Sequence, residues 1–530
     1  MASAVALACL LPQRAFAQSS TSLLTDATVL PRHGFEIGVQ SRWTRFDQLL
    51  GGRLGNRPLG SNFSTDSLGT AQLASFGPSE NAIRALTGNS AFRLTAGQLT
   101  TSANSRIVTA PLIVEYGLTS RITLGVVVPL VETRTVLVSR LNPRLGFANV
   151  GPNPNLIGNN YGATAALVQS FTTAAANLQT LLTQCQAAPS NAGCSAVLSD
   201  APQLLSSSTA FANAIAALYG TDQATHPGQE YVPLTGSDLQ KSINKQLQTF
   251  RAGYQTLLNT SAIADTSIAG AGGPAANAQL DTILAHAGYD TLGIADHSSI
   301  GDISIGATFQ LANTFGDTIA AASGATMYRL AVNGTARIGT GQPGNRNRLF
   351  DNATGYGQPG VVVGAAGDVR FRRRYSLTGI ASYTAQFGSV DVARIPNFEN
   401  NIFPLGTPLS GTYSAGNTLS ITAIPRVEIA RFFSLSGQYQ YLNVAADTYT
   451  PAGPGVSTAV FTSPPGMAAA SAQQIGVGVA YSTVSSGEAG PGRLPFEVSF
   501  RHLETIAATG GPYPKTFQDQ LSLRVYFGGK

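Results

Sequence analysis

The chain has 530 residues, only 11% of them charged, and a formal net charge of +5. Soluble domains usually carry roughly 25% charged residues, and helical membrane proteins contain apolar runs of about 20 residues, so this composition fits neither class. It favours a membrane-spanning β-barrel, whose strands are apolar on one face only. The sequence has no basic stripe with interleaved aromatic residues, so we expect no nucleic-acid partner.

The N-terminus is typical of an export signal. Residues 3–11 form a short apolar stretch, and residues 15–17 read AFA, which matches an A-x-A cleavage pattern. We therefore predict a signal peptide over residues 1–17, whose removal takes Cys9 with it. No positively charged region precedes the apolar stretch, which leaves open that the true start lies upstream.

Period-two alternation of apolar and polar residues recurs along the chain and predicts β-strands. In one segment Tyr328, Leu330 and Val332 alternate with Arg329 and Asn333. The pattern predicts strands over residues 35–46, 106–116, 121–132, 301–311, 326–339, 360–371, 375–388, 418–429, 433–443, 473–483, 494–504 and 519–528. The predicted fold class is an all-β transmembrane barrel of about 12 antiparallel strands.

The connections between these strands alternate between shorter and longer, which favours a barrel over a soluble sandwich. Outer-membrane barrels have short periplasmic turns and long extracellular loops. The shorter connections are 117–120, 312–325, 372–374, 430–432 and 484–493. The longer ones, which we place outside the cell, are 47–105, 133–300, 340–359, 389–417, 444–472 and 505–518. Aromatic residues near strand ends suit a bilayer interface, namely Trp43, Tyr116, Phe371, Tyr375, Phe433, Phe496 and Phe527.

One long connection, 133–300, is predicted to be a large α-helical extracellular insert. Helical spacing recurs over residues 162–187, 196–219 and 236–258. One apolar helix face is predicted to consist of Leu167, Phe171, Ala174, Leu178 and Leu181. Ser237 followed by Gln240 resembles a capping box at the start of the third helix. The predicted domains are 1–17 as signal peptide, 18–132 with strands one to three and a long first outer loop, 133–300 as the insert, and 301–530 with strands four to twelve.

Two cysteines remain after signal removal, Cys185 and Cys194. The residues between them are rich in turn formers, and exported proteins meet an oxidising environment in which near cysteines form disulfides. We predict a Cys185–Cys194 disulfide that closes a hairpin. The alternative is two free thiols in a loop.

The strands also resemble a known family. Residues 115–126 (EYGLTSRITLGV) and 301–307 (GDISIGA) are similar to strand and turn segments of outer-membrane barrels associated with meta-pathway phenol degradation. That family is loosely similar to the long-chain fatty-acid transporters. The resemblance implies passage of small, often hydrophobic, compounds across the outer membrane. The helical insert lies outside the resemblance.

Charged residues on the polar face of the strands are the candidate functional residues. The alternation predicts that they face the lumen, where they would set the solute preference of a pore or pair with one another in a packed interior. Seven arginines against five acids would give a mild preference for anionic solutes. The set comprises Glu36, Arg42, Glu115, Arg329, Arg337, Asp368, Arg370, Arg426, Glu428, Glu497, Arg501 and Arg524.

Catalytic and cofactor sites are not expected. His297 and Ser299 have the H-x-S spacing of outer-membrane phospholipases, but the other motifs of those enzymes are absent around them. The histidines do not stand at metal-ligand spacing with acidic partners, and the glycines near residue 341 are not followed by a phosphate-binding helix. We therefore predict no enzyme activity, no metal and no other cofactor.

The sequence thus favours an outer-membrane transporter or porin-like channel for small, hydrophobic solutes, with lipid and solute as its partners. The alternative is an outer-membrane anchor whose insert, through residues 150–296, binds an envelope or surface protein.

Overall fold

A computed structural model describes residues 23–52, 55–144, 146–286, 288–290, 293–315, 325–345, 348, 351–371, 374–393, 409–452, 469–484 and 495–528. The predicted signal peptide, residues 1–17, lies outside the described residues. The chain divides into two compact units. The first contains residues up to Phe63, Thr101–Val138 and the chain from Asp290 onward, and the second contains Ser64–Thr100 and Ser139–Tyr289.

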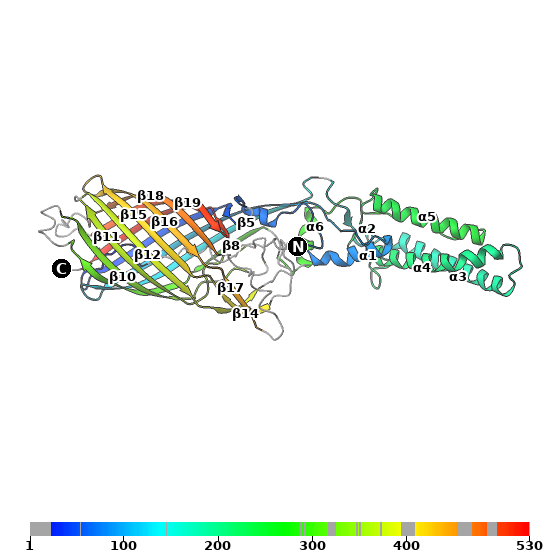
Figure 1. Ribbon diagram of the computed structural model, residues 1–530, viewed down its shortest axis with the longest axis horizontal. Helices are drawn as coiled ribbons and strands as arrows, with labels where there is room; N and C mark the ends of the chain where they lie inside the picture. Colours follow the sequence, from blue (N-terminus) through cyan, green and yellow to red (C-terminus); the bar gives the residue numbers. More distant parts are fainter. Residues whose placement is uncertain are drawn as a thin grey trace, which may run out of the picture. The chain divides into compact units, whose positions relative to one another are not determined.

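The first unit is a closed antiparallel barrel (Figure 1). Its sheet runs in the order β4-β1-β21-β19-β18-β16-β15-β12-β11-β10-β9-β5, and pairing of β4 with β5 closes the ring of twelve strands. The strands are β1 (Phe35–Phe46), β4 (Leu99–Gly117), β5 (Ile122–Leu141), β9 (Ile303–Asn313), β10 (Met327–Ile338), β11 (Gly360–Phe371), β12 (Tyr375–Gln386), β15 (Thr418–Glu428), β16 (Phe433–Val444), β18 (Ala470–Ser482), β19 (Phe496–Gly510) and β21 (Phe517–Phe527).

The twelve-stranded barrel predicted from the alternation is confirmed. The structure has one further strand, β8 (Ile294–Ile300). β8 pairs with the second half of β5, whereas β9 pairs with the first half. In addition, β4 begins earlier and β5 ends later than the sequence predicted. Residues 99–105 are mostly Thr, Ser and Ala, so apolar and polar positions differ too little there for periodicity to detect a strand. Pairing with a neighbouring strand determines that part of the fold.

Side chains alternate between the two faces of the barrel wall, as strand geometry requires. On β10, Leu330 is 45% exposed, whereas its neighbour Ala331 is 1% exposed. The buried positions of all strands therefore face the barrel interior, and the exposed apolar positions face outward.

Short elements lie in the connections of this unit. Two three-stranded sheets are formed by β13 (Ser389–Ala393), β14 (Leu409–Ser414) and β17 (Thr448–Pro451), and by β20 (Pro512–Pro514), β2 (Gln48–Gly51) and β3 (Arg57–Pro58). A 3-10 helix, η1 (Leu59–Phe63), follows β3.

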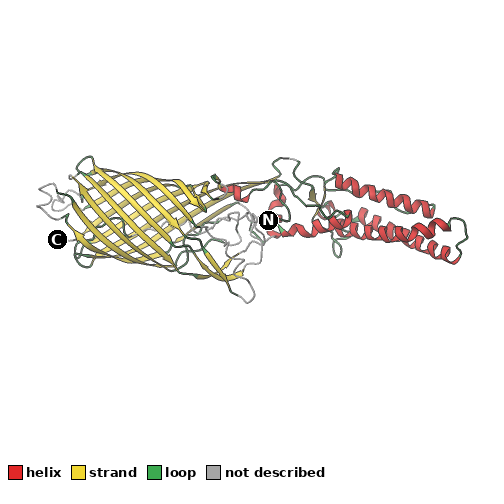
Figure 2. Cartoon of the chain, viewed as in Figure 1, coloured by secondary structure: helices red, strands yellow, loops and turns green. Residues whose placement is uncertain are grey.

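The second unit is mainly helical (Figure 2). It contains η2 (Ala74–Phe76), α1 (Gly77–Thr87), β6 (Val150–Pro152), α2 (Pro154–Gly158), α3 (Gly162–Ala187), α4 (Cys194–Tyr219), β7 (Tyr231–Pro233), α5 (Asp238–Leu258) and α6 (Asn277–His286). Its two chain segments connect β1 to β4 and β5 to β8. The helical unit thus includes Ser64–Thr100, which the predicted 133–300 insert omitted, while β8 belongs to the barrel unit. No helix among the described residues is both long enough and apolar enough to cross a membrane.

The three predicted helices are present as α3, α4 and α5, and they share an aromatic core. The ring centroid of Phe171 on α3 lies 6.0 Å from that of Phe211 on α4 and 6.2 Å from that of Phe250 on α5. The predicted apolar face of α3 is buried at Leu167, Phe171, Ala174 and Leu178, but Leu182 is buried in place of the predicted Leu181. A straight helix advances slightly less than a full turn in three residues and slightly more in four, so the last contact moved by one position.

The predicted disulfide is confirmed, because Cys185 at the end of α3 is bonded to Cys194 at the start of α4.

The expected cap of α5 forms in part. The hydroxyl of Ser237 accepts a hydrogen bond from the Gln240 backbone N–H at 3.2 Å. The Gln240 side chain does not return to the cap. Its Oε1 accepts a hydrogen bond from the Tyr219 hydroxyl at 2.7 Å, and its Nε2 donates to the Ile268 carbonyl at 2.6 Å.

Candidate functional site in the barrel lumen

The predicted lumen-facing charges lie on seven strands of the barrel, at positions that alternate with the outward apolar ones. Register pairing keeps them on one face, because partners in an antiparallel ladder point to the same side. By strand, they are Glu36 and Arg42 on β1, Glu115 on β4, Arg329 and Arg337 on β10, Asp368 and Arg370 on β11, Arg426 and Glu428 on β15, Glu497 and Arg501 on β19, and Arg524 on β21. Their role as the charges that line a passage stays a prediction.

Several of these charges form ion pairs with acids from other parts of the barrel wall. The contacts are Arg329 Nε to Asp368 Oδ2 at 2.9 Å, Arg370 Nη2 to Glu428 Oε1 at 2.8 Å, Arg524 Nε to Glu36 Oε1 at 3.6 Å, and Arg337 Nε to Asp302 Oδ2 at 3.8 Å. Asp302, which joins β8 to β9, was not among the predicted site residues. Pairing offsets the cost of holding these charges away from bulk water.

Residues 23–30, the N-terminal segment, lie against the inner wall of the barrel. The Ala27 N–H donates a hydrogen bond to Asp368 Oδ2 at 3.0 Å, and the Ala27 carbonyl accepts one from Gln310 Nε2 at 3.1 Å. The Leu30 N–H donates to Thr123 Oγ1 at 2.8 Å. These three wall residues belong to β11, β9 and β5, so the segment is held from several strands.

Two leucines of the N-terminal segment pack into the same wall. Their partners are Ile113 and Val127 for Leu23, and Ala331 and Ala366 for Leu24. A glycine provides the space for each leucine, because a Cβ on Gly125 would lie 2.6 Å from Leu23 Cδ2 and one on Gly364 would lie 2.9 Å from Leu24 Cδ2. Burial of a leucine side chain contributes about 1.5–3 kcal/mol, so these contacts fix the segment firmly.

The N-terminal segment also reaches the far part of the ring. Arg524 Nη2 on β21 donates a hydrogen bond to Thr25 Oγ1 at 2.8 Å. Its contacts therefore extend from β21 to β11, β9 and β5, and the segment crosses the interior and narrows it. Neither periodicity nor a motif predicted this element. The available signal is a stretch between the predicted cleavage site and β1 that is too short to form a domain and contains Leu23, Leu24 and Asp26.

The connection between β10 and β11 also folds against the inner wall. His297 Nε2 on β8 pairs with Asp351 Oδ1 at 2.7 Å. Asn352 Nδ2 donates to Thr135 Oγ1 at 2.8 Å, and Thr133 Oγ1 donates to the Asn352 carbonyl at 3.0 Å. Thr133 and Thr135 occupy buried, inward positions of β5. This connection, which the sequence placed outside the cell, thus has an inward-folded part that we call the inner loop (the described residues 339–345, 348 and 351–359).

Asp302 anchors the base of the inner loop. Its two carboxylate oxygens accept hydrogen bonds from the N–H groups of Gly341 and Tyr356, each at 2.8 Å. The guanidinium of Arg337 lies 4.7 Å from the ring centroid of Tyr356, a cation–π contact. Gly341 and Gly355 approach so closely that a Cβ on Gly355 would lie 2.7 Å from Gly341 Cα. Arg337, predicted as a lumen charge, therefore holds the inner loop.

The H-x-S pair does not form a nucleophile and base. Ser299 Oγ hydrogen-bonds Thr354 Oγ1 at 2.6 Å and donates to the Ile300 carbonyl at 3.1 Å, while His297 pairs with Asp351. A hydrolase of the Ser–His type activates its serine hydroxyl through a hydrogen bond to the imidazole. Both side chains serve here to bind the inner loop.

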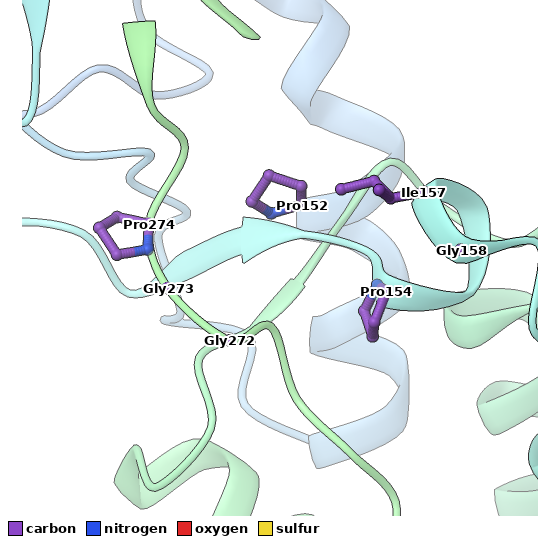
Figure 3. Close-up of a pocket in the computed structure, with 7 residues that line it drawn as sticks. All are labelled: Pro152, Pro154, Ile157, Gly158, Gly272, Gly273 and Pro274. Carbon is purple, nitrogen blue, oxygen red and sulfur yellow. The ribbon is translucent and has the colours of Figure 1, made fainter. Parts of the chain in front are cut away.

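The helical unit has a surface pocket of about 390 Å³ (Figure 3). It is lined by Pro152, Pro154, Ile157, Gly158, Gly272, Gly273 and Pro274. These residues offer apolar contact and backbone groups but no titratable side chain. The pocket therefore suits an apolar group, and its lining offers no side chain for acid–base or nucleophilic chemistry.

The outer face of the barrel is apolar. Every strand of the ring exposes at least one large apolar side chain there, and Val477, for example, is 67% exposed. Continuous apolar surface of this kind requires lipid, and closure of the sheet satisfies all ladder hydrogen bonds within it. The chain is an outer-membrane β-barrel of the bacterial type.

Comparisons with known proteins add structural neighbours only. No protein-family model and no curated protein matches the chain. Similar solved structures include an outer membrane channel from Pseudomonas putida F1, at 9% identity and a TM-score of 0.39 over 95% of this chain and 98% of that one. A Pseudomonas aeruginosa FadL homologue has 9% identity and a TM-score of 0.27, covering 93% and 90%. The Pseudomonas putida toluene transporter TodX has 10% identity and a TM-score of 0.26, covering 93% and 89%. Because these TM-scores are low, we argue the function from the lumen of this chain.

Proposed function

We propose that the protein is an outer-membrane channel or transporter for small solutes, and that the N-terminal segment and the inner loop set the width of its passage. One observation carries this proposal: a closed barrel encloses a polar, charged interior in which a chain segment is hydrogen-bonded across the ring. A barrel that served only as an anchor has no need of such a lumen. Hydrophobic solutes are the class implied by the resemblance of residues 115–126 and 301–307.

Planar-bilayer conductance of the purified full chain tests the proposal. The intact protein is expected to give small, discrete current steps, because two elements narrow its lumen. Removal of residues 18–30 after the signal peptide is expected to give larger steps. Absence of conductance in both forms, with the barrel folded, would contradict the proposed channel.

A second candidate is an anchoring role for the barrel with a partner bound by the helical unit. The observation that favours it is the apolar pocket, in which Ile157 is 68% exposed. Liposome-swelling measurements with and without the helical unit distinguish the two functions. A channel swells liposomes in both forms, whereas an anchor does so in neither.

A further inference from the structure

Several lumen arginines lie on one row of paired residues that crosses neighbouring strands of the barrel wall. The strand register places each residue of the row opposite the next, so all of them point to the same side of the wall. From β1 to β15 the row reads Arg42, Gln520, Arg501, Gly478, Ser436 and Arg426. Neighbouring strands are about 4.8 Å apart, and the curvature of the ring turns the side chains toward one another.

Two arginines of this row have no close acidic partner. Among the described residues, neither Arg426 nor Arg501 forms an ion pair within 4.0 Å. Arg501 lies within electrostatic range of two like charges, Arg426 and Arg524, and of one carboxylate, Glu497. Farther along the same row, Arg370 has Glu428 as a partner at 2.8 Å. Where arginines outnumber the acids within reach, an anion that joins them reduces their mutual repulsion.

The two arginines are separated along the row by small residues. Gly478 and Ser436, which separate them in the row, are small. Gln438, two residues beyond Ser436 on the same face of β16, has a buried Oε1 atom with no hydrogen-bond partner among the described residues. The oxygen and nitrogen of an amide are assigned from their partners, so the same side chain turned over presents an N–H group to an anion.

We infer that Arg426, Arg501 and Gln438 form a binding site for the carboxylate of a small organic anion that passes through the lumen. Guanidinium groups present paired donors that match the two oxygens of a carboxylate, and the amide supplies a further donor. The site lies on β15, β16 and β19, whereas the N-terminal segment is anchored mainly to β5, β9, β10 and β11. The inference rests on the proposed function, because it names the substrate class of the same lumen.

The test compares the wild type with the double variant Arg426→Gln/Arg501→Gln in planar bilayers. In a KCl gradient the wild type is expected to prefer anions over cations, and added benzoate is expected to reduce its current. A hydrogen bond to a charged group contributes about 1.5–3 kcal/mol, so the double variant should need at least about tenfold more benzoate for half-block and should lose the anion preference. Benzamide, which has the same ring without the charge, should block neither form at these concentrations.

The matched control is Arg370→Gln/Glu428→Gln, which removes a neighbouring lumen ion pair without changing the net charge. It should keep the benzoate response and the anion preference of the wild type. The proposed site is overturned if benzoate reduces the current of the Arg426/Arg501 variant as strongly as that of the wild type. It is also overturned if the control loses its benzoate response as fully as that variant does.

Calorimetric titration of the detergent-solubilised protein with benzoate separates the two proposals. Binding without conductance overturns the channel and retains the site, whereas conductance without binding overturns the site alone.

Discussion

At the residue scale, Asp368 joins the N-terminal segment to the barrel wall. It is 4% exposed, and its carboxylate accepts hydrogen bonds from the Ala27 N–H, from Arg329 Nε and from Thr378 Oγ1, the last at 2.6 Å. Bonds to a charged acceptor are stronger than those between neutral groups. This one carboxylate therefore holds both a lumen arginine and the segment that narrows the passage.

The variant Asp368→Asn should loosen the N-terminal segment. The amide keeps the shape of the carboxylate but loses its charge, so the bond to Ala27 weakens and Arg329 loses its ion-pair partner. We expect larger and noisier single-channel currents than in the wild type, measured in planar bilayers. Glu428→Gln, which removes one lumen acid that does not contact the segment, serves as control. Equal currents in both variants would show that the lost charge, and not the segment, alters the passage.

Alternation predicted that Asp368 and Arg329 point inward, because side-chain direction in a strand has a period of two. It could not predict that they pair with each other or that Asp368 receives the Ala27 N–H. Those contacts depend on which strands are neighbours and on where residues 23–30 lie. Local periodicity predicts neither of these.

At the scale of elements, buried tyrosines tie the helices of the second unit together. Tyr219 on α4 is 1% exposed and donates to Gln240 on α5. Burial raises the pKa of Tyr219, and burial together with the charge of Glu230 raises the pKa of Tyr231. A tyrosine ionises at about pH 10 in an unfolded chain. Above that pH the unfolded state loses its protons first, so the free energy of unfolding falls as pH rises.

The helical unit is therefore expected to lose stability from about pH 10 upward. Thermal melts followed by the helical circular dichroism signal measure this dependence. Tyr219→Phe should reduce the alkaline slope, while at neutral pH it should cost about 1–3 kcal/mol because Gln240 keeps a buried acceptor without a donor. An unchanged slope in this variant would contradict the assignment to Tyr219.

The disulfide between α3 and α4 closes a short connection, with a sequence separation of 9 residues. In the chain-entropy view, cross-linking so short a loop stabilises the folded state by about 2–3 kcal/mol. Replacement of both cysteines by serine should lower the melting temperature of the helical signal and leave the barrel signal unchanged. Reduction of the wild type should reproduce the effect, and reductant should have no effect on the variant.

At the scale of the whole molecule, two units with separate cores share one chain. The barrel is closed by its own strand pairing, and the helical unit has its own aromatic core and disulfide. Replacement of both segments of the helical unit, Ser64–Thr100 and Ser139–Tyr289, by flexible Gly/Ser linkers should therefore leave the barrel intact. Heat-modifiable migration on a gel, the usual sign of a folded barrel that resists detergent, should persist, and so should conductance. Loss of heat-modifiable migration would show that barrel folding needs the helical unit.

The sequence by itself determined the class of fold, the number of barrel strands, the inward face of each strand, the main helices and the disulfide. All of these follow from local periodicity, chain connectivity or cysteine spacing. Only the tertiary structure decided what occupies the lumen. The N-terminal segment has no periodicity, and the sequence of the inner loop resembles that of an outer loop. Both are held by partners distant in sequence, such as Asp368 and Asp302. The arginine row has the same origin, because Arg42, Arg501 and Arg426 come to one row only through the register of strands that lie far apart along the chain.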